Sequence, residues 1–164
     1  GPGLNLLLAW DAWMRAGLDG PLQFTSFEAY PMRPEDMAQA HAAFPALDGR
    51  RDALTAAWDG TGGVLDLPGL RAEIIIGDAR QALPAWQGQV DAWFLDGFSP
   101  AKNPELWGDA LMAEVARHTA PSSTAATYTA AGFVRRALGA GGFEVTRIPG
   151  YGRKRHMTRA QMPV

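Results

Sequence analysis

The stretch VDAWFLDGFSPAKNPELW, residues 90–107, decides the fold of this chain. Residues 90–95 form a short apolar run that is typical of a buried strand. The run ends at Asp96-Gly97, a common turn dipeptide, and a helix is expected to begin near Pro104. A carboxylate at the carboxyl end of a buried strand lies where open α/β sheets bind ligands. Asp96 is therefore a candidate functional residue, and capping of a plain turn is its alternative role.

Two further acids follow predicted strands in the same way. The segment 22–28, LQFTSFE, alternates like a strand and ends on Glu28, and the apolar segment 70–76 is followed by Gly77-Asp78. Asp78 has an alternative role as the N-cap of a helix over 80–86. Three acids at successive strand ends predict a ligand with several polar edges, and S-adenosylmethionine has this layout. Glu28 would accept hydrogen bonds from ribose hydroxyls, Asp78 and Ala79 would bind the adenine amine, and Asp96 would lie near the reacting end.

The N-terminal stretch GPGLNLLLAWDAWMRAG predicts a helix that stops at Gly17, with Gly1 and Gly3 directly before it. A glycine-rich turn, a helix and a strand that ends in an acid form the second part of a nucleotide-binding βαβ unit. The first strand of this unit is expected to be missing, which predicts one domain, residues 1–164, that is incomplete at its N-terminus. Gly1 and Gly3 could also form a plain turn, and Gly1-Pro2 could be a cloning remnant.

The remaining segments alternate between helices and strands, which predicts an α/β fold with a doubly wound, mostly parallel, Rossmann-like sheet. The last two predicted strands form an antiparallel pair, a feature of the class I methyltransferase fold. The predicted elements are helices over 34–44, 50–58, 104–118 and 130–139, a flexible break at 61–63, and strands over 123–128, 143–148 and 153–158.

Composition limits the classes of function. The chain of 164 residues has 47% hydrophobic and 20% charged residues and no cysteine. The absence of cysteine excludes a disulfide framework, a thiolate nucleophile and a cysteine-ligated zinc. Three scattered histidines offer no metal-ligand spacing, and no apolar run approaches the ~18 residues of a membrane span. These features predict a cytoplasmic enzyme with no bound metal and no membrane association.

Positive charge gathers toward the C-terminus. From Gly132 onward the chain has seven basic residues and a single acid, Glu144, whereas the whole chain carries 15 basic and 17 acidic residues. A solvated basic tail is one interpretation. The other is a phosphate-binding surface on an otherwise acidic protein.

Three segments, FLDGFSPAKNPELW, TYTAAGFVRRAL and GYGRKRHM, closely resemble the methyltransferase module of the MnmC family. GLNLLLAW, SFEAYP and IIIGDA resemble it too. The resemblance implies a class I S-adenosylmethionine-dependent methyltransferase that converts the 5-aminomethyl-2-thiouridine of certain tRNAs to its 5-methylaminomethyl form. Residues 49–71 match the family poorly, and Pro2 stands where the family usually has threonine. No FAD-dependent oxidase module follows, which implies a stand-alone or truncated form whose oxidase partner lies on the same or another chain.

The resemblance also implies roles for individual residues. Asp96 would orient the substrate amine and accept its proton, and the basic C-terminal residues would bind the anticodon stem-loop of tRNA. Phe98 and Trp107 could stack on the target base, although large aromatic residues are more often core. The expected cofactor ligands are Gly1, Gly3, Glu28, Asp78, Ala79 and Asp96, and the expected tRNA ligands are Lys102, Asn103, Tyr151, Arg153, Lys154 and Arg155.

Three other functions stay open on sequence grounds. A small-molecule amine methyltransferase would have no use for the basic C-terminus. A nicotinamide-dependent reductase would read ribose through Glu28 but lacks an evident pair of residues for hydride transfer. A non-catalytic binding remnant would follow if the missing start weakened cofactor binding.

Overall fold

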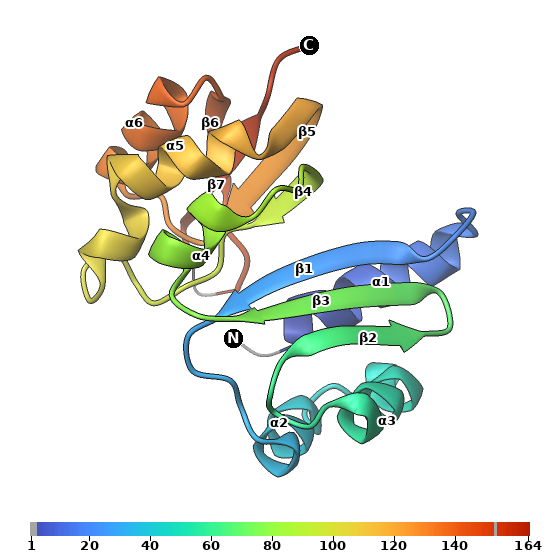
Figure 1. The fold of residues 1–164 in the computed structure, drawn as a ribbon. Helices are drawn as coiled ribbons and strands as arrows, with labels where there is room; N and C mark the ends of the chain where they lie inside the picture. Colours follow the sequence, from blue (N-terminus) through green and yellow to red (C-terminus); the bar gives the residue numbers. More distant parts are fainter. Residues whose placement is uncertain (1–2, 153) are drawn as a thin grey trace. The chain divides into compact units, whose positions relative to one another are not determined.

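Two mixed β-sheets, one in each half of the chain, organise the protein (Figure 1). The computed structural model describes residues 3–152 and 154–164. The chain divides into two compact units, Gly1–Ala82 and Leu83–Val164, and the helix α4 (Ala79–Ala85) contains the boundary. Both units combine helices with parallel and antiparallel strands, so the expected α/β class is confirmed.

The sheet of the first unit has the strand order β1-β3-β2. β1 (Leu22–Glu28) runs parallel to β3 (Leu70–Ile76), and the pairing extends from Leu22 opposite Leu70 to Glu28 opposite Ile76. β2 (Gly63–Leu67) runs antiparallel to β3. The bounds of β1 and β3 agree with those predicted from sequence. Because β1 and β3 are parallel, their carboxyl ends meet at one edge of this sheet.

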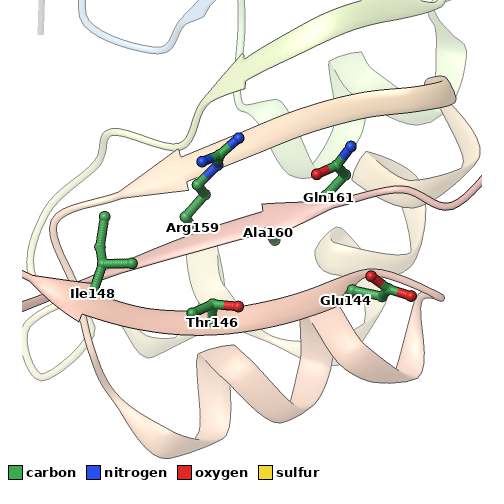
Figure 2. Close-up of a pocket in the computed structure, with 6 residues that line it drawn as sticks. All are labelled: Glu144, Thr146, Ile148, Arg159, Ala160 and Gln161. Atoms are coloured by element: carbon green, nitrogen blue, oxygen red, sulfur yellow. The ribbon is translucent and has the colours of Figure 1, made fainter.

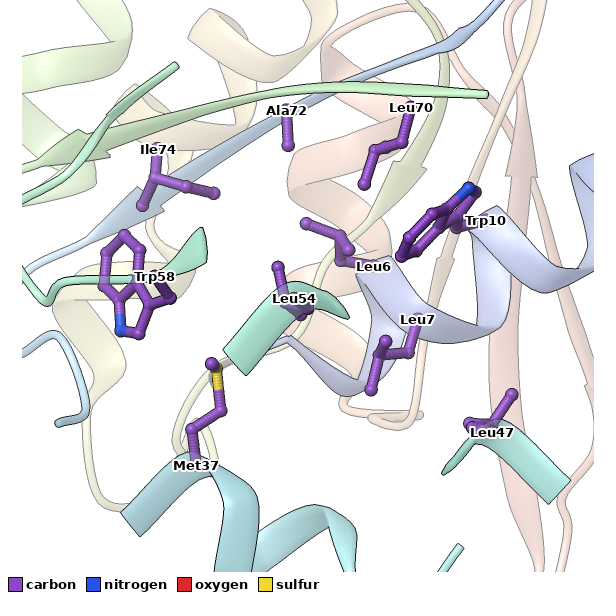
Figure 3. Packing of buried hydrophobic residues seen from close by; sticks show 10 residues of the cluster. All are labelled: Leu6, Leu7, Trp10, Met37, Leu47, Leu54, Trp58, Leu70, Ala72 and Ile74. Carbon is purple, nitrogen blue, oxygen red and sulfur yellow. The ribbon is translucent and has the colours of Figure 1, made fainter. Parts of the chain in front are cut away.

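Helices cover the face of this sheet from which Leu70, Ala72 and Ile74 project. These alternate residues of β3 are buried against the apolar side of α1, as Figure 3 shows. Two buried tryptophans of this unit each donate an indole N–H to a backbone carbonyl, Trp10 to Pro68 at 3.1 Å and Trp58 to Met32 at 2.8 Å. The helical elements of this unit are α1 (Leu4–Ala16), α2 (Pro34–His41), the 3₁₀ turn η1 (Pro45–Leu47) and α3 (Asp48–Ala57).

The sheet of the second unit has the order β4-β5-β7-β6. β4 (Val90–Phe94) runs parallel to β5 (Thr119–Thr127), and β7 (His156–Gln161) runs antiparallel to both β5 and β6 (Glu144–Pro149). The predicted closing antiparallel pair is therefore confirmed, although β7 begins later than expected.

Helices also bury one face of the second sheet. Ala125 and Ala160 project from neighbouring strands toward the apolar sides of the helices, and both are almost fully buried. α5 and α6 pack against each other, and α6 also contacts β6. The helical elements are the 3₁₀ turn η2 (Pro104–Trp107), α5 (Asp109–Arg117) and α6 (Gly132–Ala140).

Three expectations about the elements were wrong. The break expected at residues 61–63 leads directly into β2, which sequence reasoning missed. The helix expected over 104–118 is interrupted at Gly108, where the backbone is extended. β4 is not a buried strand: within residues 3–152 and 154–164 it pairs with β5 alone, and Phe94 is 50% exposed.

The expectation of a further strand before Gly1 stays a prediction. Within the described ranges β1 pairs on one side only, with β3. Gly1 and Pro2 lie outside the described residues, so the predicted role of Gly1 in cofactor binding has no structural account.

Candidate functional site

Gly3 lies at the start of α1 in a conformation that favours glycine. Its φ is 84°, in the left-handed region, and its carbonyl accepts the first helical hydrogen bond, from Leu7 at 2.8 Å. A Cβ atom at this position would lie 3.0 Å from Cε1 of the buried His41 and 3.3 Å from Leu54. The side chains of His41 and Leu54 therefore crowd the space that a side chain at position 3 would need, and the positive φ independently favours glycine there.

Glu28 ends β1 at the edge where β3 also ends. Ser26 Oγ donates to Glu28 Oε1 at 2.8 Å, and the Gly77 N–H donates to the Glu28 carbonyl at 3.0 Å. The structure thus brings Glu28 and the turn that holds Asp78 together, as the parallel pairing predicts. Figure 1 shows the start of α1 on this same side of the first unit.

Asp78 caps α4, which is the alternative role that the sequence suggested. Its Oδ1 accepts the backbone N–H of Arg80 at 2.9 Å, and both carboxylate oxygens accept from the Arg80 guanidinium. These hydrogen bonds from Arg80 hold the pKa of Asp78 below its usual range. Ala79 is the first residue of α4. Binding of an adenine amine by Asp78 and Ala79 stays a prediction, and there the amine would share the carboxylate with Arg80.

Asp96 belongs to the second unit and follows β4 by two residues. The Leu95 N–H donates to the Ala126 carbonyl at 2.9 Å, which extends the pairing with β5 past Phe94. The Asp96 N–H then donates to the Phe94 carbonyl at 3.0 Å, which turns the chain. Asp96 is exposed at this turn. Its turn role is therefore observed, and the exposed carboxylate also lies at the carboxyl edge of a parallel strand pair.

The loop after Asp96 separates two aromatic residues that sequence reasoning treated alike. Trp107 is 3% exposed, and its indole N–H donates to the Phe98 carbonyl at 2.8 Å. Phe98 itself is 69% exposed. Trp107 is thus a core residue that fixes the loop, whereas Phe98 is accessible to a ligand. Lys102 is exposed and Asn103 is half-buried on the same loop.

The predicted tRNA ligands near the C-terminus lie in the turn between β6 and β7. Tyr151 is 88% exposed, and Lys154 and Arg155 are exposed as well. Two backbone hydrogen bonds close this turn, from Gly150 to Arg155 and from Lys154 to Tyr151, each 3.1 Å. Arg153 lies outside the described residues. Since β7 runs antiparallel to β5, this turn lies at the sheet edge where β5 ends, so the cations are not on a loose tail.

Sequence reasoning missed two exposed aromatic residues at that edge. Tyr128 directly follows β5 and is 53% exposed, and Phe133 in the first turn of α6 is 39% exposed. The signal that could have found them is the segment TYTAAGFVRRAL, which carries part of the family resemblance.

A shallow groove crosses the open face of β6 and β7 (Figure 2). It extends from the terminal pair Glu144 and Gln161 to Ile148 and includes no predicted site residue. The lining residues are Glu144, Thr146, Ile148, Arg159, Ala160 and Gln161.

The described residues offer neither a metal-binding cluster nor a membrane-spanning helix. Residues 3–152 and 154–164 contain no group of three or more His, Asp or Glu side chains placed to hold a metal ion. In the same ranges, every helix is too short or too polar to cross a bilayer.

Comparisons with known proteins agree with this geometry. Residues 60–163 match the family described as S-adenosyl-L-methionine-dependent methyltransferase. One relative is the tRNA 5-methylaminomethyl-2-thiouridine biosynthesis bifunctional protein MnmC of Chromobacterium violaceum. The two sequences are 43% identical over a region that includes 96% of this chain and 25% of that protein. The same protein of Pseudomonas fluorescens is 44% identical over 98% of this chain and 25% of its own length. The predicted resemblance to MnmC is thus confirmed, and the chain spans about a quarter of these relatives.

Solved structures support the fold. MNMC2 from Aquifex aeolicus aligns with all of this chain and with 52% of its own, at a TM-score of 0.75 and 24% identity. The methyltransferase SibL aligns at a TM-score of 0.52 and 15% identity. At these identities the likeness establishes the fold alone, which is that of class I methyltransferases.

Proposed function

Because the chain belongs to the S-adenosyl-L-methionine-dependent methyltransferase family, we propose that it methylates the primary amine of 5-aminomethyl-2-thiouridine at the wobble position of tRNA. The observation that carries this proposal is the exposed Asp96 carboxylate at the carboxyl edge of β4, inside a segment that resembles the MnmC family. The relatives named for tRNA 5-methylaminomethyl-2-thiouridine biosynthesis support the choice of substrate.

The residues of the first unit fit the proposed cofactor. Gly3 lies directly before α1, where a nucleotide-binding unit places its glycines, and Glu28 offers a carboxylate for ribose hydroxyls. Asp78 and Ala79 complete this edge on the neighbouring strand. When bound, S-adenosylmethionine supplies an electrophilic methyl group on a sulfonium sulfur.

Asp96 prepares the substrate amine for attack. The amine must be neutral, because its nitrogen lone pair forms the new N–C bond as the C–S bond breaks and its electrons return to sulfur. The Asp96 carboxylate orients the amine and accepts the proton that the nitrogen loses. Alignment of the two substrates contributes a large share of the acceleration. The target base leaves the anticodon stack to reach this site, where Phe98 is exposed.

The longer relatives suggest the setting of this activity. They are described as bifunctional, and we propose that an FAD-dependent oxidase module on the same or another chain supplies the second activity, in the cytoplasm where tRNA is modified. The family match weighs against the nicotinamide-dependent reductase considered from sequence.

The experiment that tests the function is single-turnover transfer of a labelled methyl group from S-adenosylmethionine. We expect transfer to tRNA that carries 5-aminomethyl-2-thiouridine and none to the same tRNA with unmodified uridine. Small primary amines are the comparison substrates. Equal or faster methylation of small amines would favour the small-molecule methyltransferase. Binding of cofactor without any transfer would favour the binding remnant.

Replacing Glu28 tests the cofactor assignment. We expect Glu28→Ala to raise the Kd for S-adenosylmethionine by about 5- to 150-fold in isothermal titration, because the ribose hydroxyls would lose their acceptor, a cost of about 1–3 kcal/mol. Glu35→Ala is the matched control, since this carboxylate is exposed on α2 and pairs with Arg33. Unchanged affinity in Glu28→Ala, or competition by NADH, would count against the assignment.

Replacing the turn cations tests the RNA surface. In Lys154→Ala/Arg155→Ala we expect weaker tRNA binding and a slope of log K against log salt that is shallower by about 1.4, near 0.7 for each lost phosphate contact. The methylation rate at saturating tRNA should be preserved. Arg33→Ala/Arg71→Ala is the control, because both cations already pair with carboxylates. A wild-type salt slope in the turn variant would mean that these cations are only solvated.

A further inference from the structure

An exposed strip of two aromatic rings and one guanidinium follows β5. It consists of Tyr128, Phe133 and Arg136, and we call it the Tyr128 strip. Phe133 and Arg136 are three residues apart on α6 and therefore lie on the same side of the helix. The guanidinium of Arg136 folds back toward the start of α6, where one of its nitrogens lies 3.2 Å from the position of a Cβ on Gly132. No carboxylate in residues 3–152 and 154–164 pairs with Arg136.

The backbone beneath Tyr128 is held by three hydrogen bonds. Thr127 Oγ1 accepts from the Thr129 N–H at 3.3 Å, and Thr129 Oγ1 accepts from the Ala131 N–H at 3.1 Å. The hydroxyl of Thr158, which is 1% exposed, donates to the Thr129 carbonyl at 2.7 Å. Tyr128 is thus an exposed ring on a fixed loop, which lowers the entropy lost when a ligand stacks on it.

The strand register relates Tyr128 to Asp96. Phe94 pairs with Ala126, and the Leu95 N–H donates to the Ala126 carbonyl. Asp96 and Tyr128 each follow this pair by two residues and therefore leave the same sheet edge from adjacent parallel strands. Phe94 and Ala126, the last residues of this pairing, are both exposed.

We infer that the Tyr128 strip binds the single-stranded nucleotides around the reactive base, an inference that rests on the proposed function. Tyr128 stacks on the base whose amine meets Asp96, Phe133 stacks on a neighbouring base, and Arg136 pairs with a backbone phosphate. Exposed aromatic rings beside cations are the usual surface for unpaired RNA. The excess of positive charge after Gly132, seven basic residues against one acid, complements the phosphates.

The test measures binding of a fluorescent anticodon stem-loop RNA by anisotropy, with a fully paired RNA duplex of equal length as the second probe. We expect Tyr128→Ala and Phe133→Ala each to raise the Kd for the stem-loop by about 5- to 150-fold, the usual effect of losing one stacked base. Duplex binding should not change. Tyr128→Phe keeps the ring and should bind within about twofold of wild type. Arg136→Gln should make the salt slope shallower by about 0.7.

Phe44→Ala is the matched control, because Phe44 is 40% exposed and Phe133 is 39% exposed. Wild-type binding by Tyr128→Ala and Phe133→Ala would overturn the inference, and so would an equal loss in Phe44→Ala or an equal loss for the duplex. If the wild-type protein binds the stem-loop and the strip variants match it, only this inference falls. If the wild-type protein binds S-adenosylmethionine but neither RNA, the proposed tRNA substrate falls with it.

Discussion

Asp96→Asn should methylate its tRNA substrate about 10²- to 10⁴-fold more slowly than the wild-type protein in a single turnover. The substitution preserves the shape of the side chain and removes the negative charge that accepts the amine proton. Because Asp96 is exposed at a turn after β4, the protein should fold normally. The affinities for S-adenosylmethionine and tRNA should change little, so the loss should appear in the rate at saturating substrates.

The control for this prediction is Asp91→Asn. Asp91 is an exposed carboxylate on β4 itself, five residues before Asp96, and should have no part in proton transfer. A wild-type rate in Asp96→Asn would reduce Asp96 to a turn residue and leave alignment of the substrates as the source of the acceleration. An equal loss of rate in both variants would point to a general electrostatic effect of β4.

Leu7→Ala should lower the free energy of unfolding by about 2–5 kcal/mol, the range for removing a fully buried leucine side chain. Leu7 is 0% exposed and lies in the apolar side of α1 that packs in the core of the first unit (Figure 3). The next residue offers a matched control, because Leu8 is 47% exposed on the same helix. Leu8→Ala should stay within about 0.5 kcal/mol of wild type.

Urea denaturation followed by tryptophan emission measures both variants. Two of the six tryptophans, Trp10 and Trp58, are buried in the same core as Leu7, so the emission includes a signal from this unit. Similar midpoints for Leu7→Ala and Leu8→Ala would contradict the packing of α1. A change in the slope of the unfolding free energy against urea concentration would instead indicate that the unfolded or native state had changed in compactness.

Local sequence predicted the bounds of β1 and β3 because each strand has a continuous local signal. An apolar or alternating run ends at a polar residue or glycine, and no distant contact is needed to see it. β2 has no such signal, because Gly62 and Gly63 resemble a break. A Cβ on Gly62 would lie 2.8 Å from the Ile74 carbonyl, so glycine is needed there for close approach to β3. The glycine at position 62 is therefore explained by its contact with β3 and not by the local sequence.

For the candidate site, as for the strands, the sequence predicted positions but not contacts. The positions of Glu28, Asp78 and Asp96 at strand ends followed from sequence, and the parallel pairing of β1 with β3 brings the first two together. The sequence could not show that Arg80 holds the Asp78 carboxylate, since Asp-Ala-Arg occurs in many conformations. It also could not separate Phe98 from Trp107, because burial depends on neighbours far along the chain.

The sequence by itself determined the order of helices and strands, the acids at the strand ends and the resemblance to a methyltransferase family, since all three are carried by local runs of residues. The tertiary structure decided which side chains meet. Tyr128 and Asp96 are 32 positions apart in the chain, and they reach one sheet edge only through the register of β4 with β5. Hydrogen bonds between strands set that register, and no local segment contains it.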